Sequence, residues 1–143
     1  MEEDYKVIMS PKKIMIWTLR IVAAAIMLQT LYFKFTGHPE SVSLFTELGV
    51  EPWGRIGTGV IELIASILIL IPATSYIGAT LAIGLMAGAI GAHLFVLGVS
   101  YGGNPLLFIY AVIVFVACTI LLFFEKEKIF GLVKKYTNIT LPG

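Results

Sequence analysis

Glu62 is the residue in this sequence whose type and setting most strongly indicate chemistry. It is the only formally charged residue between Arg55 and Glu125, in a stretch that is otherwise so apolar that it indicates membrane. An acidic residue at the centre of a membrane-spanning helix costs roughly 2.5 to 3.5 kcal/mol on insertion scales. A residue that costly to insert either pairs with another polar group or faces a cavity. The chemistry of the chain therefore depends on what Glu62 meets.

Composition predicts that this chain is embedded in a lipid membrane. The chain has 143 residues, of which 58% are hydrophobic and 13% charged, whereas soluble domains carry about 25% charged residues. This length accommodates about four spanning helices of roughly 20 residues each. We predict an all-α integral membrane protein, a single domain over residues 1–143, built as a four-helix transmembrane bundle.

Charge and cysteine content disfavour two classes of function. The net charge is +1, so there is no basic surplus of the kind that nucleic-acid binding requires, and we expect no nucleic-acid partner. Cys118 is the single cysteine. A membrane thiol–disulfide enzyme needs at least two exchanging thiols, so that class is disfavoured within this chain.

Apolar runs and turn signals predict the spans at about residues 14–35, 54–71, 76–99 and 105–124, followed by a tail over 125–143. Ser10 and Pro11 form a helix-start signal, with serine as the N-cap and proline at the first helical position. The first apolar segment is full length and lacks a small-residue cleavage site, so we expect an uncleaved anchor. The sequence PESVSLFTELG, between the first two spans, predicts a short amphipathic helix on the membrane surface.

The lysines predict the orientation. They flank the two ends of the chain, whereas the connection between the first two spans carries Glu40, Glu47 and Glu51. Basic residues favour the cytoplasmic side, and an even number of spans brings both ends to the same side. We therefore predict that both termini are cytoplasmic and that the amphipathic helix lies in the first outer loop. The lysines concerned are Lys6, Lys12, Lys13, Lys126, Lys128, Lys134 and Lys135.

Four helices each place one hydrogen-bonding side chain at a similar depth in the outer half of the membrane. At 1.5 Å per residue, these groups lie roughly 8 to 12 Å below the outer ends of their helices. Such a layer could form a cavity that opens outward. The candidate binding residues are Glu62, His93, Gln29 and Tyr110 in this layer, Lys34 just above it and Arg20 below it.

The role of this layer stays open at the level of sequence. Glu62 can pair with Lys34 and His93, nearer the outer surface, at a pocket that opens outward. Alternatively, it can pair with Arg20, nearer the cytoplasmic surface, as a structural link between the first two spans. Polar groups in small bundles often only join neighbouring helices, at about 0.6 kcal/mol each on average. Lys34 and Arg55 can simply extend toward the interface. His93 has no second histidine or cysteine at ligand spacing, so no metal site is predicted, and no residue is assigned as catalytic.

The residues and their order resemble the DoxX family of small four-helix bacterial membrane proteins. After Lys34 come, in order, ESVSLFTELGVEPWGR, then GVIEL with Glu62, then LILIP and GATLAIGLMAGAIGAHL. The likeness covers roughly residues 20–124. Lys34, the Leu48-Gly49 turn and Glu62 fit the family pattern. The chain departs from it just before the lysine, where Leu31, Tyr32 and Phe33 stand in place of the usual small residues.

The resemblance implies a place in the bacterial cytoplasmic (inner) membrane and a first hypothesis for function. Some members are similar to the membrane subunit of a thiosulfate:quinone oxidoreductase, and others are associated with oxidative stress or thiol metabolism. The chain has no haem-ligand pair, iron–sulfur cysteines or nucleotide fingerprint, so in redox chemistry a partner protein would supply the electrons. The first hypothesis is therefore a quinone-facing or assembly component of a membrane redox system, with quinone as the candidate cofactor.

The second hypothesis is a non-catalytic scaffold or assembly factor, and the third is a small-solute or proton carrier. One four-helix chain is small for alternating access, so a carrier would be a homo-oligomer. Its seam would follow Gly84 and Gly88, which with Gly91 form a small-residue face suited to close helix contact. The same face could instead pack inside the bundle. Whether the chain is an enzyme is not decided by its sequence.

Overall fold

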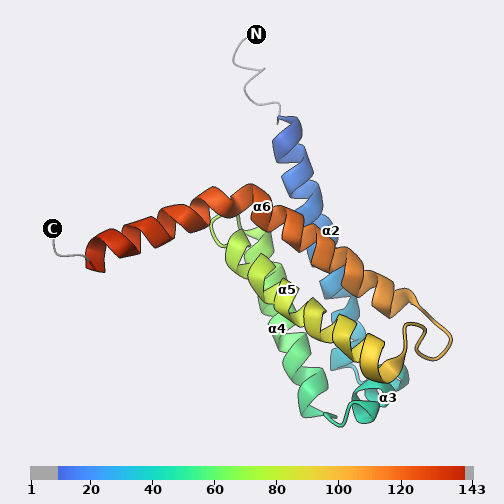
Figure 1. The fold of residues 1–143 in the computed structure, drawn as a ribbon. Coiled ribbons are helices and arrows are strands. Elements are labelled where there is room, and N and C mark those ends of the chain that lie inside the picture. Colours follow the sequence, from blue (N-terminus) through green and yellow to red (C-terminus); the bar gives the residue numbers. More distant parts are fainter. Residues whose placement is uncertain (1–9, 141–143) are drawn as a thin grey trace.

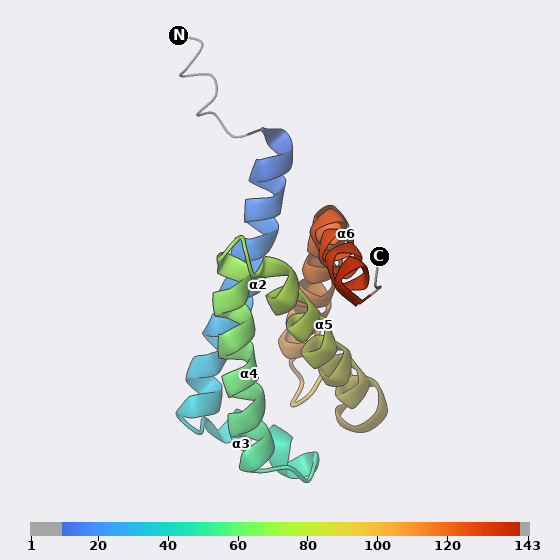
Figure 2. The same ribbon diagram turned by 90° about the vertical axis from the view of Figure 1, so that its left-hand side faces the viewer.

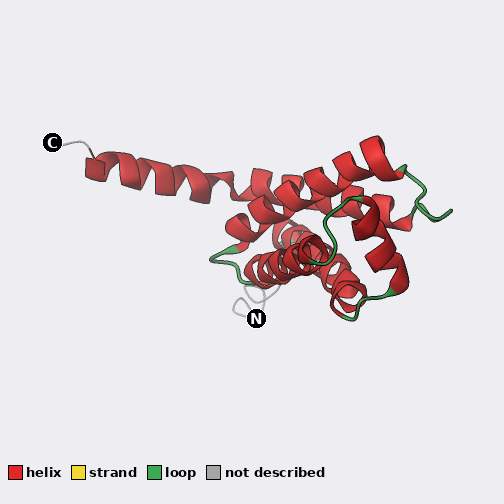
Figure 3. Ribbon diagram, turned by 90° about the horizontal axis from the view of Figure 1, so that it is seen from below, coloured by secondary structure: helices red, strands yellow, loops and turns green. Residues whose placement is uncertain are grey.

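The structure is a computed structural model in which residues 10–140 are described. Lys6, one of the lysines in the orientation argument, lies outside the described residues, as do residues 141–143 of the tail. Within the described part of the chain there are helices and loops but no strand (Figure 3). One isolated antiparallel bridge joins Tyr101 and Asn104 in a loop. The prediction of an all-helical chain is confirmed.

Four helices are long and apolar enough to cross a membrane, as predicted. These segments are Pro11–Phe35, Trp53–Leu70, Ser75–Leu97 and Leu106–Glu127. The elements in order are α2 (Pro11–Phe35), α3 (Pro39–Glu47), α4 (Trp53–Leu70), α5 (Ser75–Ala92), the π-helix η1 (His93–Leu97) and α6 (Leu106–Thr140). The short helix α3 stands where the amphipathic pattern predicts a helix.

The helices form a bundle with two distinct ends (Figures 1 and 2). The end of α2, all of α3, the start of α4 and the loop between η1 and α6 gather at one end, here called the α3 end. The short turn between α4 and α5 lies at the opposite end. From that turn, α4 and α5 diverge toward the α3 end (Figure 2). The divergence matters because Lys34, Glu62 and His93 lie in the half of the bundle nearer to α3.

Local sequence explains how these helices begin and end. The side chain of Ser10 accepts a hydrogen bond from the backbone N–H of Lys13 at 3.3 Å, and Pro11 occupies the first turn of α2. The predicted start signal is therefore present. Gly37 and Gly49 adopt φ of +67° and +76° after α2 and α3. Because this left-handed conformation is unfavourable for residues with a side chain, glycine ends both helices at these positions.

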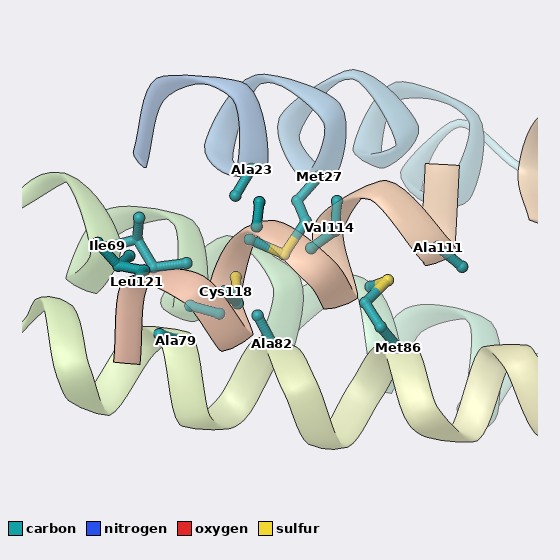
Figure 4. Packing of buried hydrophobic residues seen from close by; sticks show 12 residues of the cluster. Ala23, Met27, Ile69, Ala79, Ala82, Met86, Ala111, Val114, Cys118 and Leu121 are labelled. Carbon is teal, nitrogen blue, oxygen red and sulfur yellow. The ribbon is translucent and has the colours of Figure 1, made fainter. Parts of the chain in front are cut away.

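Small and medium apolar residues from all four long helices form the core (Figure 4). Ala82 and Met27 face Val114, Cys118 and Leu121 of α6 in this cluster. A close helix crossing lies at Gly78 of α5. A Cβ atom there would lie 2.7 Å from the backbone oxygen of Ala65 and the backbone nitrogen of Ile69 on α4, which is possible only for glycine. Larger apolar side chains, among them Ile21, Ile64, Ile67 and Val116, are exposed on the outside of the bundle.

The glycine face of α5 does not make the internal contact that its spacing permits. No atom lies within 4 Å of a Cβ built on Gly84, Gly88 or Gly91. Internal packing, one of the two roles left open for this face, is therefore absent from the bundle. Gly78, one turn from the start of α5, makes the close contact instead.

Helix α6 extends well beyond the predicted end of the fourth span. The sequence predicts a span ending near residue 124 and a tail that loses its periodicity, but a single helix continues to Thr140. Figure 1 shows that α6 bends as it leaves the bundle and then projects away from it. The polar residues after Phe124 end the membrane-like composition without ending the helix, because lysine and glutamate are good helix formers.

Candidate functional site

Glu62 pairs with Lys34. The Nζ of Lys34 lies 2.5 Å from Oε2 of Glu62, and the hydroxyl of Thr30 donates to the same oxygen at 3.3 Å. Thr30 and Lys34 are four residues apart and so share one face of α2. The side chains of Lys34 and Glu62 are 15% and 6% exposed. Of the two pairings that the sequence leaves open, the structure has the one with Lys34.

The close approach of α2 and α4 explains why this pair can form. A Cβ atom on Gly59 of α4 would lie 2.8 Å from the ring of Phe35 on α2. Gly59 therefore leaves room for the aromatic side chain next to Lys34. One turn further along α4, Glu62 then faces α2. The pair thus joins two helices that are already in tight contact.

Arg55 fixes the end of α2 above the ion pair. It donates to the backbone carbonyl oxygen of Lys34, and its Nε and Nη2 each lie 2.8 Å from Oε1 of Glu51. Arg55 is buried, so extension into the interface, the role considered for it from sequence, is not what it does. The spacing of Glu51 and Arg55, four residues apart, is the signal that could have identified this contact.

His93 is buried at the junction of α5 and η1. Its Nδ1 lies 3.0 Å from the carbonyl oxygen of Gly98, and its ring meets that of Phe108 edge-to-face at 5.8 Å between centroids. A carbonyl oxygen only accepts hydrogen bonds, so Nδ1 carries the proton. In the neutral ring Nε2 is then an acceptor, and no hydrogen bond to Nε2 is present in the described part of the chain. His93 therefore combines a structural bond on one nitrogen with a free acceptor on the other.

A cavity of about 270 Å³ lies between α2, α3, α5 and α6 and brings five of the six candidate residues together. Gln29, Lys34, Glu62, His93 and Tyr110 all line it. Most of the remaining wall is apolar and includes Met27, Leu44, Phe45, Met86 and Val114. An apolar cavity with a few converging polar groups is typical of small-molecule sites. The shared depth predicted from helix rise corresponds to a shared cavity.

Sequence reasoning missed several polar residues that line the same cavity. Thr30, which donates to Glu62, is one of them, and its position one turn before Lys34 is the signal that could have found it. His38, Ser41 and Asn104 also line the cavity. They lie in loops or on α3, where the depth of a residue cannot be estimated from helix rise.

Arg20 does not join this group. Its Nη2 lies 2.6 Å from Oε1 of Glu125, and its Nε donates to the hydroxyl of Ser75 at 3.1 Å. Its guanidinium also lies 4.9 Å from the centre of the Trp17 ring. Arg20 thus belongs to a second buried cluster, at the end of the bundle opposite α3, and its pairing with Glu62 is not formed. Glu125 supplies the carboxylate in its place.

No group of three or more histidine, cysteine, aspartate or glutamate residues that could hold a metal ion occurs within residues 10–140. The polar lining of the cavity offers ammonium, carboxylate, imidazole, amide, phenol and hydroxyl groups, from the five candidate residues and from Thr30, His38, Glu40, Ser41 and Asn104. Together these groups can hydrogen-bond to a polar ligand and exchange protons with it.

Comparison with known proteins identifies the family of the chain. Neither the curated proteins nor the solved structures contain a match. Among protein families, the DoxX-like family matches residues 18–121. This match includes Lys34, Glu62, His93 and Tyr110, and it agrees with the resemblance seen in the sequence. With four membrane-spanning helices and a family match over most of its length, the chain is a multi-pass membrane protein that belongs to the DoxX-like family.

Proposed function

We propose that this protein is the quinone-facing component of a redox system in the bacterial inner membrane. The observation that carries the proposal is the buried Lys34–Glu62 pair in the wall of an apolar cavity that also reaches His93. When bound, a quinone takes up two electrons and two protons at its ring oxygens. Electrons would come from a partner protein, because the sequence has no haem, iron–sulfur or nucleotide signature of its own.

The polar groups suit both oxidation states of a quinone head group. The ammonium of Lys34 can donate a hydrogen bond to a quinone carbonyl, and Tyr110 offers a second donor. The free Nε2 of His93 and the carboxylate of Glu62 can accept hydrogen bonds from the hydroxyls of the reduced form. Glu62 and His93 are also groups that can exchange protons with such hydroxyls. The apolar wall would hold the rest of the ring.

The test is native mass spectrometry of the gently solubilised protein, combined with solvent extraction and an absorbance scan for quinone. Wild type is compared with Glu62→Gln and with Glu47→Gln, which changes an exposed carboxylate on α3 outside the cavity. We expect a quinone-mass adduct in wild type and Glu47→Gln that is lost in Glu62→Gln. If no form carries an adduct, or if all three carry it equally, the cavity does not hold a quinone head group.

A non-catalytic scaffold is the second candidate, and one observation favours it. The part of α6 beyond the bundle exposes Phe130 and Val133, at 67% and 57%, which would offer a surface to a partner protein. In that case a partner would co-purify with Glu62→Gln as well as with wild type. A carrier, by contrast, would show pH-dependent flux in liposomes that Glu62→Gln abolishes.

A further inference from the structure

A second cavity, of about 350 Å³, lies between α4 and α5 near the α3 end. Its wall on α5 includes Gly84, Gly88 and Ala92, and its opposite wall includes Trp53 and Thr58 of α4. It lies where α4 and α5 diverge (Figure 2). This cavity is here called the lateral groove. Its lining is mainly apolar, and the large apolar residues exposed outside the bundle mark the adjoining surface as one that faces lipid.

The lateral groove meets the first cavity at the ion pair. Lys34, Glu62, Met86, Ala89 and His93 line both cavities. Met86, Ala89 and His93 share one helix face, Leu85 and Ala92 lie beside that face in the groove lining, and Gly88 and Gly84 follow further round the helix. The Lys34–Glu62 pair and the buried ring of His93, with its free Nε2, therefore lie between the two cavities. A ligand whose polar end contacts this pair has an apolar passage leading away from it.

We propose that the lateral groove holds the isoprenoid tail of the quinone whose head group binds at Lys34 and Glu62. This inference rests on the proposed function and adds the route by which the ligand enters, sideways from the bilayer between α4 and α5. At Gly84 and Gly88 the groove lining carries no side chain. Because no atom lies within 4 Å of a Cβ built on Gly84 or Gly88, a larger side chain fits there and takes up groove space.

The structure supplies a matched control at Gly91. It lies on the same helix, and a Cβ built on it also meets no atom within 4 Å, but it lines neither cavity. Gly88→Leu and Gly91→Leu therefore add the same side chain to α5, once inside the groove and once outside it. Gly84→Leu is the second groove variant, in case Gly88→Leu fails to fold by circular dichroism.

The experiment measures quinone affinity in lipid nanodiscs from the saturable quenching of Trp53 fluorescence. Trp53 lines the groove, and a Trp17→Phe background removes the other tryptophan. The titrants are decylubiquinone and ubiquinone-0, which share a ring but differ in the tail. We expect Gly88→Leu to weaken decylubiquinone binding roughly tenfold, about 1.4 kcal/mol, and to change ubiquinone-0 binding less than about twofold. Gly91→Leu should change neither.

The outcomes separate this inference from the proposed function. If Glu62→Gln weakens both titrants but Gly88→Leu weakens neither, the head-group site stands and the tail lies elsewhere, with a phospholipid chain as the occupant of the groove. If Gly88→Leu and Gly91→Leu weaken binding equally and native mass spectrometry shows loss of a dimer, a second copy of the chain covers this face. If wild type binds neither titrant, the proposed function fails and the inference with it.

Discussion

The Lys34–Glu62 ion pair stabilises the fold, because either charge buried without the other would be strongly destabilising. Both side chains are largely shielded, at 15% and 6% exposed. Removing one partner of a buried ion pair is typically destabilising by about 3 to 5 kcal/mol, because the remaining charge stays buried without compensation. Replacing both partners can be nearly neutral. The pair therefore stabilises the fold mainly because each buried charge neutralises the other.

A double-mutant cycle tests this coupling. In detergent micelles, we expect Lys34→Met to lower the free energy of unfolding by about 3 to 5 kcal/mol, because it leaves the carboxylate of Glu62 buried alone. Glu62→Gln should lower the free energy of unfolding by less, because the remaining Lys34 is closer to the helix end and can extend toward water. The double variant should lose less than the sum of the two. Additivity within about 0.5 kcal/mol would mean that the two residues do not interact.

From the sequence, each site residue had an expected depth, but the choice between Lys34 and Arg20 as the partner of Glu62 was not decided. Helix rise gives the depth of a side chain, and five of the six candidates do line one cavity. The partner of a side chain also depends on how each helix is rotated about its axis and on which helices adjoin. Arg20 shows the consequence. Its long side chain seemed able to reach Glu62, but it meets Glu125, whose place on α6 was predicted as the start of a tail.

At the scale of elements, one glycine of α5 makes a helix crossing and three others do not. Gly78 lies against the backbone of α4 at Ala65 and Ile69, whereas Gly84, Gly88 and Gly91 face open space. Spacing alone favours the second group, which has the small-residue pattern. The divergence of α4 and α5 toward the α3 end accounts for the difference, since the two helices are close only near the turn that joins them (Figure 2).

Alanine substitutions distinguish these positions. We expect Gly78→Ala to lower thermal stability clearly, because its Cβ would lie 2.7 Å from backbone atoms that cannot move aside without separating the helices. Gly91→Ala should raise stability, by up to about 1 kcal/mol, because alanine is the better helix former and the position is open. Thermal unfolding followed by circular dichroism measures both. Equal effects of the two substitutions would contradict the crossing at Gly78.

Composition predicted where the membrane-spanning segments end but not where every helix ends. Apolar runs and the prolines and glycines around them gave the four spans to within a few residues. The π-helix η1 (His93–Leu97) was not predicted, because its wider backbone turn follows the α-helix without a change in apolar composition. The continuation of α6 was missed because hydropathy reports the end of a membrane segment and not the end of a helix.

At the scale of the whole molecule, α2 holds the bundle at both ends. Near the α3 end it pairs with α4 through Lys34 and Glu62. Near the opposite end, Arg20 pairs with Glu125 of α6 and bonds to Ser75 at the start of α5. Between the two ion pairs lies an apolar core without a charged side chain among its members. Both described cavities lie in the α3 half of the bundle, around the Lys34–Glu62 pair.

The orientation of the bundle in the membrane determines which side of the membrane the two cavities lie nearer to. The start of α2 and the projecting part of α6 emerge from the same end of the bundle (Figure 1), and they carry the exposed Lys12, Lys13, Lys126 and Lys135. The α3 end carries Glu40, Glu47 and Glu51. By the positive-inside rule we predict that the lysine-rich end is cytoplasmic and that both cavities lie in the outer half of the membrane.

Cysteine labelling in intact cells tests this orientation. Cys118 is fully buried, so the native cysteine should resist labelling, and Cys118→Ala, which removes only the sulfur atom, provides the cysteine-free background. We expect Glu47→Cys on α3 to react with a membrane-impermeant maleimide in intact cells, and Lys135→Cys on α6 to react only after permeabilisation. The reverse pattern would place the Lys34–Glu62 pair in the inner half. A redox partner that acts at the cavity would then have to approach from the cytoplasm, so this result also determines where such a partner should be sought.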